Sequence, residues 1–334
     1  MKTRRIAGMA VSALGLGCMN LSHAYGAPPA PADAERLLRQ ALDAGVTLFD
    51  TAALYGFGAN EELVGRVLAP VRDRIVLCSK GGMAGEPVGE GGALQRVIDG
   101  RPATIRRHVE DSLRRLRTDV IDLYYLHRLD RQVPVEDSVG AMADLVRAGK
   151  LRHLGLSEVS AATLQRAHAV HPIAAVQNEY SLWTRNPEIA LLDACRRTGT
   201  VLVAFSPLAR GFLTGRLRDV AALAPKDIRR AMPRFEPAAY AANLRLLGPF
   251  EQVARELGCT PAQLALAWLL ARGEDIVPIP GTTNPAHLRE NLAAVDVALD
   301  AATVARVGAL IDDRSVTGAR YNAATQAEID TETS

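Results

Sequence analysis

Cysteine is scarce in this chain of 334 residues, which contains only Cys18, Cys78, Cys195 and Cys259. The four lie far apart, with no C-x-x-C pair and no histidine at ligand spacing, so neither a disulfide framework nor a zinc site is expected. A chain of this length buries enough apolar surface to fold without such cross-links. We therefore expect no metal, and a reducing compartment, the cytoplasm, as the location.

Clustered positive charge is also missing. The chain has 39 basic and 37 acidic residues, a net charge of +2 and no long basic run. Nucleic acid binding needs clustered Lys and Arg that contact phosphates, so it is not expected. No apolar run approaches the roughly 20 residues that a membrane-spanning helix needs. The sequence thus predicts a protein that binds neither nucleic acid nor membrane.

The N-terminus contains a pattern that resembles a secretory or twin-arginine leader. Three basic residues within the first five positions precede an apolar stretch over residues 7–19. Glycines and a serine interrupt that stretch, and no small-x-small cleavage site follows it cleanly. We instead predict a short β-hairpin over Ile6–Ser12, which belongs to the mature protein and leads into the first buried strand.

Strand-like and helix-like segments alternate from end to end, which is typical of a parallel sheet with crossover helices. One predicted helix carries Ile105, Val109, Leu113 and Leu116 on a single stripe, and another begins at the capping residue Thr260. Eight short apolar segments are predicted to be strands: Leu14–Cys18, Thr47–Thr51, Ile75–Lys80, Ile121–His127, His153–Ser157, Ala175–Glu179, Val201–Ser206 and Val277–Gly281.

A parallel sheet of this kind is either open and doubly wound or closed into a barrel. The open sheet would bind a dinucleotide through a G-x-G-x-x-G turn, but Gly15 and Gly17 have no third glycine in register. Eight strands without a linker-like stretch favour an α/β fold of the (β/α)₈ or TIM-barrel type. We predict one domain over residues 1–334, with an N-terminal hairpin and extra C-terminal helices.

Two long segments, residues 81–102 and 210–237, follow the third and seventh predicted strands. Loops that follow strands lie on the C-terminal face of a barrel, where active sites are built. We expect both segments to cover the substrate.

Four ionisable residues stand at or just after three consecutive predicted strands. Asp50 ends the second strand and Tyr55 lies in the loop after it, while Lys80 ends the third strand and His127 the fourth. Any one of these could end a strand by chance, but four together predict a site. A carboxylate and an ammonium group buried near each other are tolerated only if they pair.

These four side chains suit the protonation of a carbonyl oxygen while a hydride reaches its carbon. The ordinary pKa of tyrosine is about 10, and the Lys80 ammonium would lower the pKa of Tyr55 by favouring the phenolate. Asp50 would hold Lys80 in place, and His127 would orient the carbonyl. A Schiff-base aldolase that uses Lys80 is a competing interpretation, although Asp50 would keep that amine protonated.

The contexts of these residues, FDTA-x-x-YG, CSKGG and YYLHRLD, resemble those of the aldo-keto reductase tetrad. The resemblance runs from about Val11 to Ala293 and is nearest to the branch with plant and bacterial aldehyde- and alkaloid-reducing members. It implies an NADP-dependent oxidoreductase that reduces an aldehyde or ketone to an alcohol, with Tyr55 as general acid–base. Shared stretches include SALGLGCMNLS, GKLRHLGLSEVS, AVQNEYSLWTR, FSPLARGFLTG and IPGTTNPAHLRENLAA.

The resemblance also implies a site for NADP(H), with NAD(H) as the open alternative. Ser157 and Gln177 would hold the nicotinamide carboxamide, and Phe205 would stack on the ring. Without the four-residue site, these positions would be interpreted as barrel filling and strand caps. The other implied cofactor contacts are to the pyrophosphate (Ser206, Leu208, Arg210), the adenosine phosphate (Gly281, Thr282, Thr283) and the adenine (Glu290, Asn291).

Two positions depart from the family pattern. Glu158 follows Ser157 where many relatives have Asn, and a carboxylate accepts but does not donate hydrogen bonds. The turn over residues 282–284 lacks the Lys or Arg that NADP-preferring relatives often have. The Thr hydroxyls, backbone N–H groups, His287 or Arg289 remain as partners for a 2′-phosphate.

His23 and most other histidines are taken as incidental, whereas Tyr25 and Trp183 are expected to line the substrate pocket. Some barrels of this family are partners of membrane proteins, so a nicotinamide-binding regulatory subunit is a second alternative to the enzyme. The expected partner is a small carbonyl compound, and the sequence predicts no oligomeric state.

Overall fold

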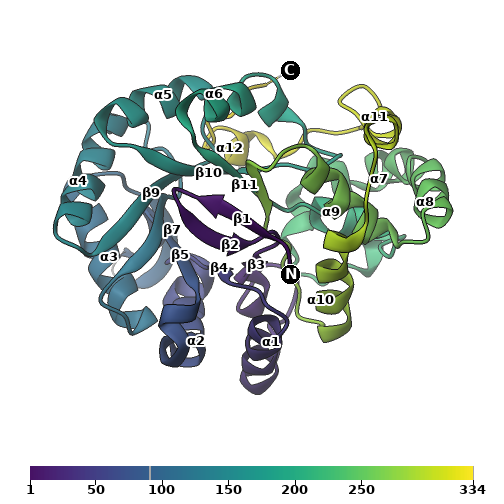
Figure 1. Ribbon diagram of the computed structural model, residues 1–334. Coiled ribbons are helices and arrows are strands. Elements are labelled where there is room, and N and C mark those ends of the chain that lie inside the picture. Colours follow the sequence, from purple (N-terminus) through teal and green to yellow (C-terminus); the bar gives the residue numbers. More distant parts are fainter. Residues whose placement is uncertain (90–91, 334) are drawn as a thin grey trace.

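A parallel eight-stranded sheet lies at the centre of the molecule (Figure 1). The structure, a computed structural model, describes residues 1–89 and 92–333. Neighbouring strands follow the order β3–β4–β5–β8–β9–β10–β11–β12, and every pair in this sheet is parallel. All eight predicted strands are confirmed, with ends that differ by a few residues. They are β3 (Leu16–Gly17), β4 (Leu48–Asp50), β5 (Val76–Gly81), β8 (Ile121–Leu126), β9 (Leu151–Ser157), β10 (Ile173–Glu179), β11 (Val201–Phe205) and β12 (Ile276–Pro278).

Backbone hydrogen bonds between the first and last strand regions close the sheet into a barrel. The Gly15 N–H donates to the carbonyl of Pro278 at 3.0 Å, and the Gly17 N–H donates to that of Pro280 at 3.2 Å. A Cβ atom on Gly17 would lie 2.9 Å from the carbonyl oxygen of Ile279, so only glycine allows this close approach. The prediction of a closed barrel is confirmed.

An antiparallel hairpin of β1 (Thr3–Ile6) and β2 (Met9–Ser12) lies across one end of the barrel (Figure 1). It begins at Thr3, earlier than the predicted start at Ile6. Ile6 and Val11 are fully buried and pack with Leu48 and Val277 of the barrel interior. The hairpin therefore seals the end of the barrel opposite to the carboxyl ends of the strands.

Amphipathic helices surround the sheet (Figure 1). The predicted stripe of the third helix is buried, and Thr260 caps its helix through the predicted capping box. Extra C-terminal helices are confirmed. The surrounding helices are α1 (Pro31–Asp43), α2 (Ala59–Leu68), α3 (Pro102–Leu116), α4 (Val135–Arg147), α5 (Ala161–Val170), α6 (Leu191–Thr198), α9 (Pro261–Ala271) and α10 (Pro285–Leu292), and the additional ones are α7 (Pro237–Leu244), α8 (Leu247–Glu256), α11 (Ala301–Leu310) and α12 (Ala323–Gln326).

The two long segments that were expected to cover the substrate have different structures. Residues 81–102 contain an antiparallel hairpin of β6 (Met83–Val88) and β7 (Ala93–Ile98). The sequence missed these strands because most β7 side chains are exposed and lack an apolar alternation. Residues 210–237 form short 3₁₀ turns, among them η5 (Ala209–Thr214) and η7 (Ile228–Ala231).

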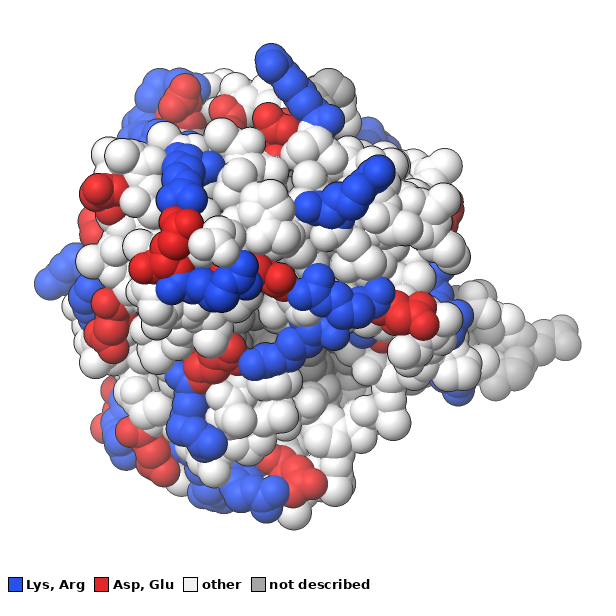
Figure 2. Space-filling model, turned by 90° about the vertical axis from the view of Figure 1, so that its right-hand side faces the viewer, with Lys and Arg blue, Asp and Glu red and all other residues white. Residues whose placement is uncertain are grey.

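The surface charge is mixed on the side of the molecule seen at the right of Figure 1. Lys and Arg are interspersed there with Asp and Glu (Figure 2), as the net charge of +2 leads one to expect. Within residues 1–89 and 92–333, none of the helices is both long and apolar enough to cross a membrane.

Candidate active site

The four ionisable residues meet at the carboxyl ends of adjacent strands. Asp50 is the last residue of β4, Lys80 lies in β5, and His127 directly follows β8. Tyr55 begins a short 3₁₀ turn after β4, and left-handed backbone at Gly56 and Phe57 turns the chain sharply before α2. Because these strands are parallel neighbours, their ends bring the four side chains to one place.

Lys80 is completely buried and has three partners. Its Nζ pairs with the Asp50 carboxylate and donates to the Thr51 carbonyl at 2.9 Å and to the Tyr55 hydroxyl at 3.2 Å. Burial disfavours the ammonium form, but Asp50 and Tyr55 outweigh it and raise the pKa of Lys80 to about 12. Lys80 is therefore charged near neutral pH, and all three of its protons are engaged.

The pKa of Tyr55 is raised, which corrects the expectation of a lowered value. Burial of the phenol is the largest cause of the increase, and the Lys80 ammonium opposes it without overcoming it. Lys80 thus acts to lower the pKa of Tyr55, as predicted, but burial raises that pKa by more. Sequence alone could not have shown this, because the burial of Tyr55 comes from residues far away in the chain.

Asp50 is 2% exposed, and both of its oxygens have partners. One oxygen faces Lys80, and the other accepts a hydrogen bond from Gln177 Nε2 at 2.8 Å. The carboxylate is thereby held in one orientation from two sides of the barrel.

His127 packs its ring edge-on against Tyr55, with 5.8 Å between ring centroids. Burial, followed by the charges of Arg128 and Lys80, moves the pKa of His127 well below its ordinary value. The imidazole is therefore neutral at neutral pH. Its Nδ1 is buried and has no hydrogen-bond partner among the described residues.

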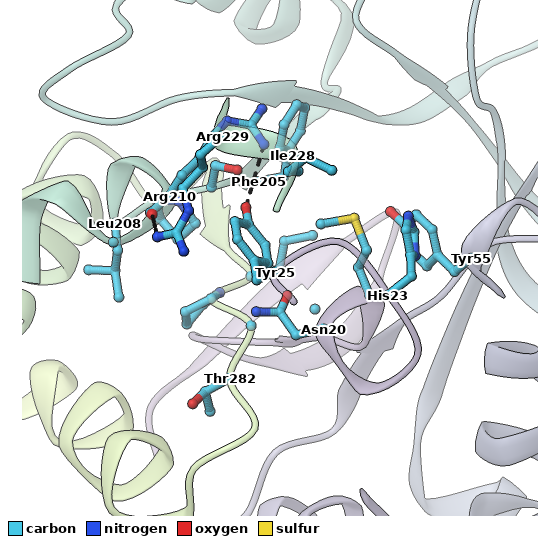
Figure 3. A pocket seen from close by; sticks show the side chains of 18 of the residues that line it. Asn20, His23, Tyr25, Tyr55, Phe205, Leu208, Arg210, Ile228, Arg229 and Thr282 are labelled. Carbon is cyan, nitrogen blue, oxygen red and sulfur yellow. Dashed lines mark hydrogen bonds between the residues drawn. The ribbon is translucent and has the colours of Figure 1, made fainter. Parts of the chain in front are cut away.

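His23 also belongs to the site, which corrects its interpretation as incidental. Its ring lies 5.7 Å from that of Tyr55, between centroids, and burial lowers the pKa of His23. Figure 3 shows it beside Tyr55, with Tyr25 further along the same wall. The available signal was its place in the loop after the first barrel strand, on the face where the site was expected.

Of the two expected pocket aromatics, one lines the site and one does not. Tyr25 lies on the cavity wall. Trp183 is 2% exposed and stacks on Phe212 with 4.3 Å between ring centroids, so it is a core residue.

A cavity of about 680 Å³ opens beside the four residues. Tyr55, His127 and an edge of Asp50 lie on its wall, whereas Lys80 is buried behind them. Most residues that the family resemblance assigned to the cofactor also line it: Ser157, Gln177, Phe205, Ser206, Leu208, Arg210, Gly281, Thr282, Thr283 and Asn291.

Glu290 is the one assigned cofactor residue that does not line this cavity. Its carboxylate instead accepts hydrogen bonds from Arg216 Nη2, at 2.8 and 3.1 Å. Arg216 itself lies on the wall, with His287. Thr282 and Thr283 line the same cavity, and His287 follows them closely in the sequence.

Arg210, which was expected to neutralise a pyrophosphate, already has an acidic partner. Its Nη2 contacts Glu179 at 2.8 Å and the Tyr321 hydroxyl at 2.9 Å. Its Nη1 lies 3.5 Å from the Tyr25 hydroxyl, across the cavity wall seen in Figure 3. Much of its charge is therefore balanced within the protein.

Glu158 points away from the cavity, toward the C-terminal segment. It is fully buried in a left-handed conformation, with φ of 56°. Its carboxylate accepts from the Glu179 N–H at 2.9 Å and pairs with Arg320, which also donates to Glu179 at 3.0 Å. Together with Arg210, these residues form a buried cluster of two carboxylates and two guanidinium groups. No sequence pattern indicates that Arg320 pairs with Glu158, because the two lie 162 positions apart.

Comparisons with known proteins agree with these observations. Residues 13–312 match the profile of the Aldo/keto reductase family. The NADP(+) aldo-keto reductase yakc of Schizosaccharomyces pombe is 43% identical over 324 residues, which cover 96% of this chain and 94% of that protein. The probable aldo-keto reductase 1 of Glycine max is 42% identical over 316 residues, which cover 94% of this chain and 89% of that protein.

Two solved structures resemble the whole barrel. The glycerol dehydrogenase AKR11B4 from Gluconobacter oxydans superposes with a TM-score of 0.84 at 30% identity, covering 92% of this chain and 94% of that one. The thermostable aldo-keto reductase Tm1743, in a complex with the inhibitor epalrestat, gives a TM-score of 0.73 at 29% identity. In that case 93% of this chain and 100% of the other are covered.

Proposed function

Since this chain belongs to the aldo/keto reductase family, we propose that it reduces an aldehyde or ketone to an alcohol and that Tyr55 supplies the proton. The observation that carries the assignment is the Tyr55 hydroxyl on the cavity wall, 3.2 Å from the charged Nζ of Lys80. The acid and a neutral imidazole then border the same space, with the ammonium group of Lys80 directly behind the acid.

Each residue has one task in this proposal. Tyr55 donates its hydroxyl proton to the carbonyl oxygen, and the Lys80 ammonium stabilises the phenolate that remains. Asp50 and the Thr51 carbonyl keep Lys80 in position. His127 is neutral, so its ring N–H donates a hydrogen bond to the same carbonyl oxygen without adding charge. In alcohol oxidation the Tyr55 phenolate takes the proton back.

The residues of the cavity fit a nicotinamide dinucleotide, which supplies the hydride when it is bound. Phe205 is half-buried and offers a ring face at the end of β11. Because Gln177 Nε2 is engaged by Asp50, the Gln177 carbonyl would accept from the carboxamide, and Ser157 would donate to it. Ser206 and Leu208, with Gly281 and the residues after it, would follow the rest of the dinucleotide.

We propose NADP(H) rather than NAD(H) as the dinucleotide. The name of the Schizosaccharomyces pombe relative supports this choice. Arg216 and His287 on the wall, with the hydroxyls of Thr282 and Thr283, offer donors for phosphate oxygens where the turn itself has no Lys or Arg. Asn291 would reach the adenine, and Glu290 would act by orienting Arg216.

We also propose one functional unit over residues 1–334 that works in the cytoplasm on small carbonyl compounds. All four cysteines are free, and Cys18, Cys78 and Cys195 are buried, which supports a reducing location.

The two alternatives to the reductase, a Schiff-base aldolase and a regulatory subunit, make different predictions. An aldolase would need the neutral amine of Lys80, which the raised pKa opposes. A regulatory subunit would bind the dinucleotide without turnover. The test is a fluorescence titration with NADPH and with NADH, followed by a panel of aldehydes and ketones with the tighter dinucleotide. Dinucleotide binding without oxidation of NADPH by any of these carbonyls would overturn the proposed reductase.

A further inference from the structure

Five arginines line the cavity, and four of them have carboxylate partners. The partnered guanidinium groups are balanced within the protein before any ligand binds, so they add little net positive charge. The pairs are Arg96–Glu328, Arg210–Glu179, Arg216–Glu290 and Arg229–Asp227.

Arg128 is the exception. Across residues 1–89 and 92–333 no carboxylate lies within ion-pair distance of it. Its Nη1 donates to the His127 carbonyl at 2.7 Å and to the Ser157 hydroxyl at 3.3 Å. These two bonds fix the half-buried guanidinium group beside the imidazole of the site. The opposite edge, Nε and Nη2, makes no hydrogen bond to the described part of the chain.

Among the residues that the structure describes, no free acid on the cavity wall compensates this charge. Asp50 is the only lining carboxylate among the described residues, and Lys80 and Gln177 occupy its two oxygens. His23 and His127 add no charge, because burial keeps them neutral. Other parts of the wall are apolar, with Met83 and Leu54 among them. A fixed cation in such surroundings attracts a complementary anion.

We propose that Arg128 recognises a carboxylate on the substrate, so that the preferred substrates are aldehydes or ketones that also carry a carboxylate group. The inference rests on the proposed reductase function and narrows its substrate class. The Nε–Nη2 edge of an arginine presents two parallel N–H donors that match the two oxygens of a carboxylate. Phosphate shares this acceptor chemistry, and the experiment separates the two.

Matched acids and esters test the proposal with NADPH as reductant. The pairs are 4-carboxybenzaldehyde with methyl 4-formylbenzoate, and succinic semialdehyde with its methyl ester. We expect the wild-type chain to have a higher kcat/KM for the acid of at least one pair. In Arg128→Gln this acid-to-ester ratio should fall roughly 10- to 100-fold, as expected for loss of a charge-assisted pair. The fall should come mainly from the KM of the acid.

The acid-to-ester ratio of kcat/KM separates recognition of the carboxylate by Arg128 from a purely structural role of Arg128. Loss of the bonds to His127 and Ser157 would slow acid and ester alike and leave the ratio unchanged. Arg128→Lys keeps the charge but not the two parallel N–H donors, so it should retain part of the wild-type acid-to-ester ratio. It also replaces Arg128→Gln as the test variant if Arg128→Gln folds poorly. Arg106→Gln removes the same charge from an exposed helix position and should leave the ratio as in the wild type.

Failure of the carboxylate proposal can be told apart from failure of the reductase proposal. If esters are reduced but no acid is preferred, or if the preference persists in both Arg128 variants, the carboxylate proposal is wrong and the reductase stands. A preference for glyceraldehyde 3-phosphate over glyceraldehyde, without any preference for the acids, would overturn the carboxylate in favour of phosphate. If neither acids nor esters are reduced, the reductase proposal itself fails.

Discussion

Gln177 donates its side-chain amide to Asp50 at 2.8 Å, on the carboxylate oxygen turned away from Lys80. The two residues come from β10 and β4, which are separated by three other strands of the sheet. The bond therefore crosses the mouth of the barrel. It connects a residue proposed to hold the nicotinamide with the acid that positions Lys80, so dinucleotide binding and proton transfer share one side chain.

Replacement of Gln177 by Met should affect both steps. It removes the amide that faces the carboxamide and leaves one Asp50 oxygen without its donor. We expect the Kd for NADPH to rise and kcat to fall together, each by roughly tenfold, the effect of one lost hydrogen bond to a charged group. Ser157→Ala is the comparison, because Ser157 does not contact Asp50; it should raise Kd with a smaller effect on kcat. Equal kinetic profiles for the two variants would argue against the double role.

Tyr55→Phe should remove the proton donor and, with it, one of the three hydrogen-bond partners of Lys80. The phenyl ring keeps its packing against His127 and His23, so the cavity keeps its shape. We expect kcat to fall by about 10²- to 10⁴-fold, the usual worth of a positioned acid, with the Kd for NADPH nearly unchanged. Steady-state turnover and fluorescence titration measure the two quantities. Turnover equal to that of the wild type would rule out Tyr55 as the acid.

Lys80→Met should destabilise the protein as well as inactivate it. It leaves the buried Asp50 carboxylate with only Gln177 as a partner, and an unpaired buried charge costs about 3–5 kcal/mol. Adding Asp50→Asn removes that charge, so the double variant should regain part of the free energy of unfolding. Urea denaturation followed by circular dichroism measures this recovery.

Turnover measurements separate the contribution of Lys80 to catalysis from its contribution to stability. Neither the single nor the double variant should regain turnover, because the Tyr55 phenolate no longer has an ammonium beside it. A double variant as unstable as Lys80→Met would show that the Asp50 charge is not the source of the destabilisation. Recovered turnover in the double variant would remove Lys80 from the proposed mechanism.

The barrel and the meeting of its strand ends could be predicted because the signals are local. Each barrel strand is a short apolar run, and Asp50, Lys80 and His127 each stand where such a run stops. Parallel strands carry their ends to one face, so topology alone brings these residues together. The hairpin β6–β7 was missed because most β7 side chains are exposed and lack the apolar alternation that marks a strand.

The features that could not be predicted depend on contacts between distant segments. Arg320 reaches Glu158 and Glu179 from the C-terminal segment, and nothing near it in the sequence indicates those partners. The isolation of Arg128 is also a tertiary property, because it depends on where every acid of the chain ends up. The net direction of the Tyr55 pKa depends on burial, which a sequence pattern does not measure.

The loss of folding stability at low pH should depend on Glu179. Burial disfavours its charged form, but Arg210, Arg320 and Arg234 outweigh it and hold the pKa of Glu179 at about 2, below the ordinary 4.5. A carboxylate whose pKa is depressed in the folded state stabilises that state above its unfolded pKa, and the contribution is lost as pH falls through the folded value. The loss should therefore occur from about pH 4.5 down to about pH 2.

Glu179→Gln removes this titration, so the comparison uses the pH dependence of stability rather than its absolute value. Between pH 6 and pH 3 the wild type should lose on the order of 2 kcal/mol more free energy of unfolding than the variant. Urea denaturation at the two pH values measures the difference. Glu136→Gln, which breaks an exposed pair with Arg166, should keep the slope of the wild type because solvent screens that pair. If Glu179→Gln also keeps that slope, the arginine cluster does not lower the pKa of Glu179 as inferred.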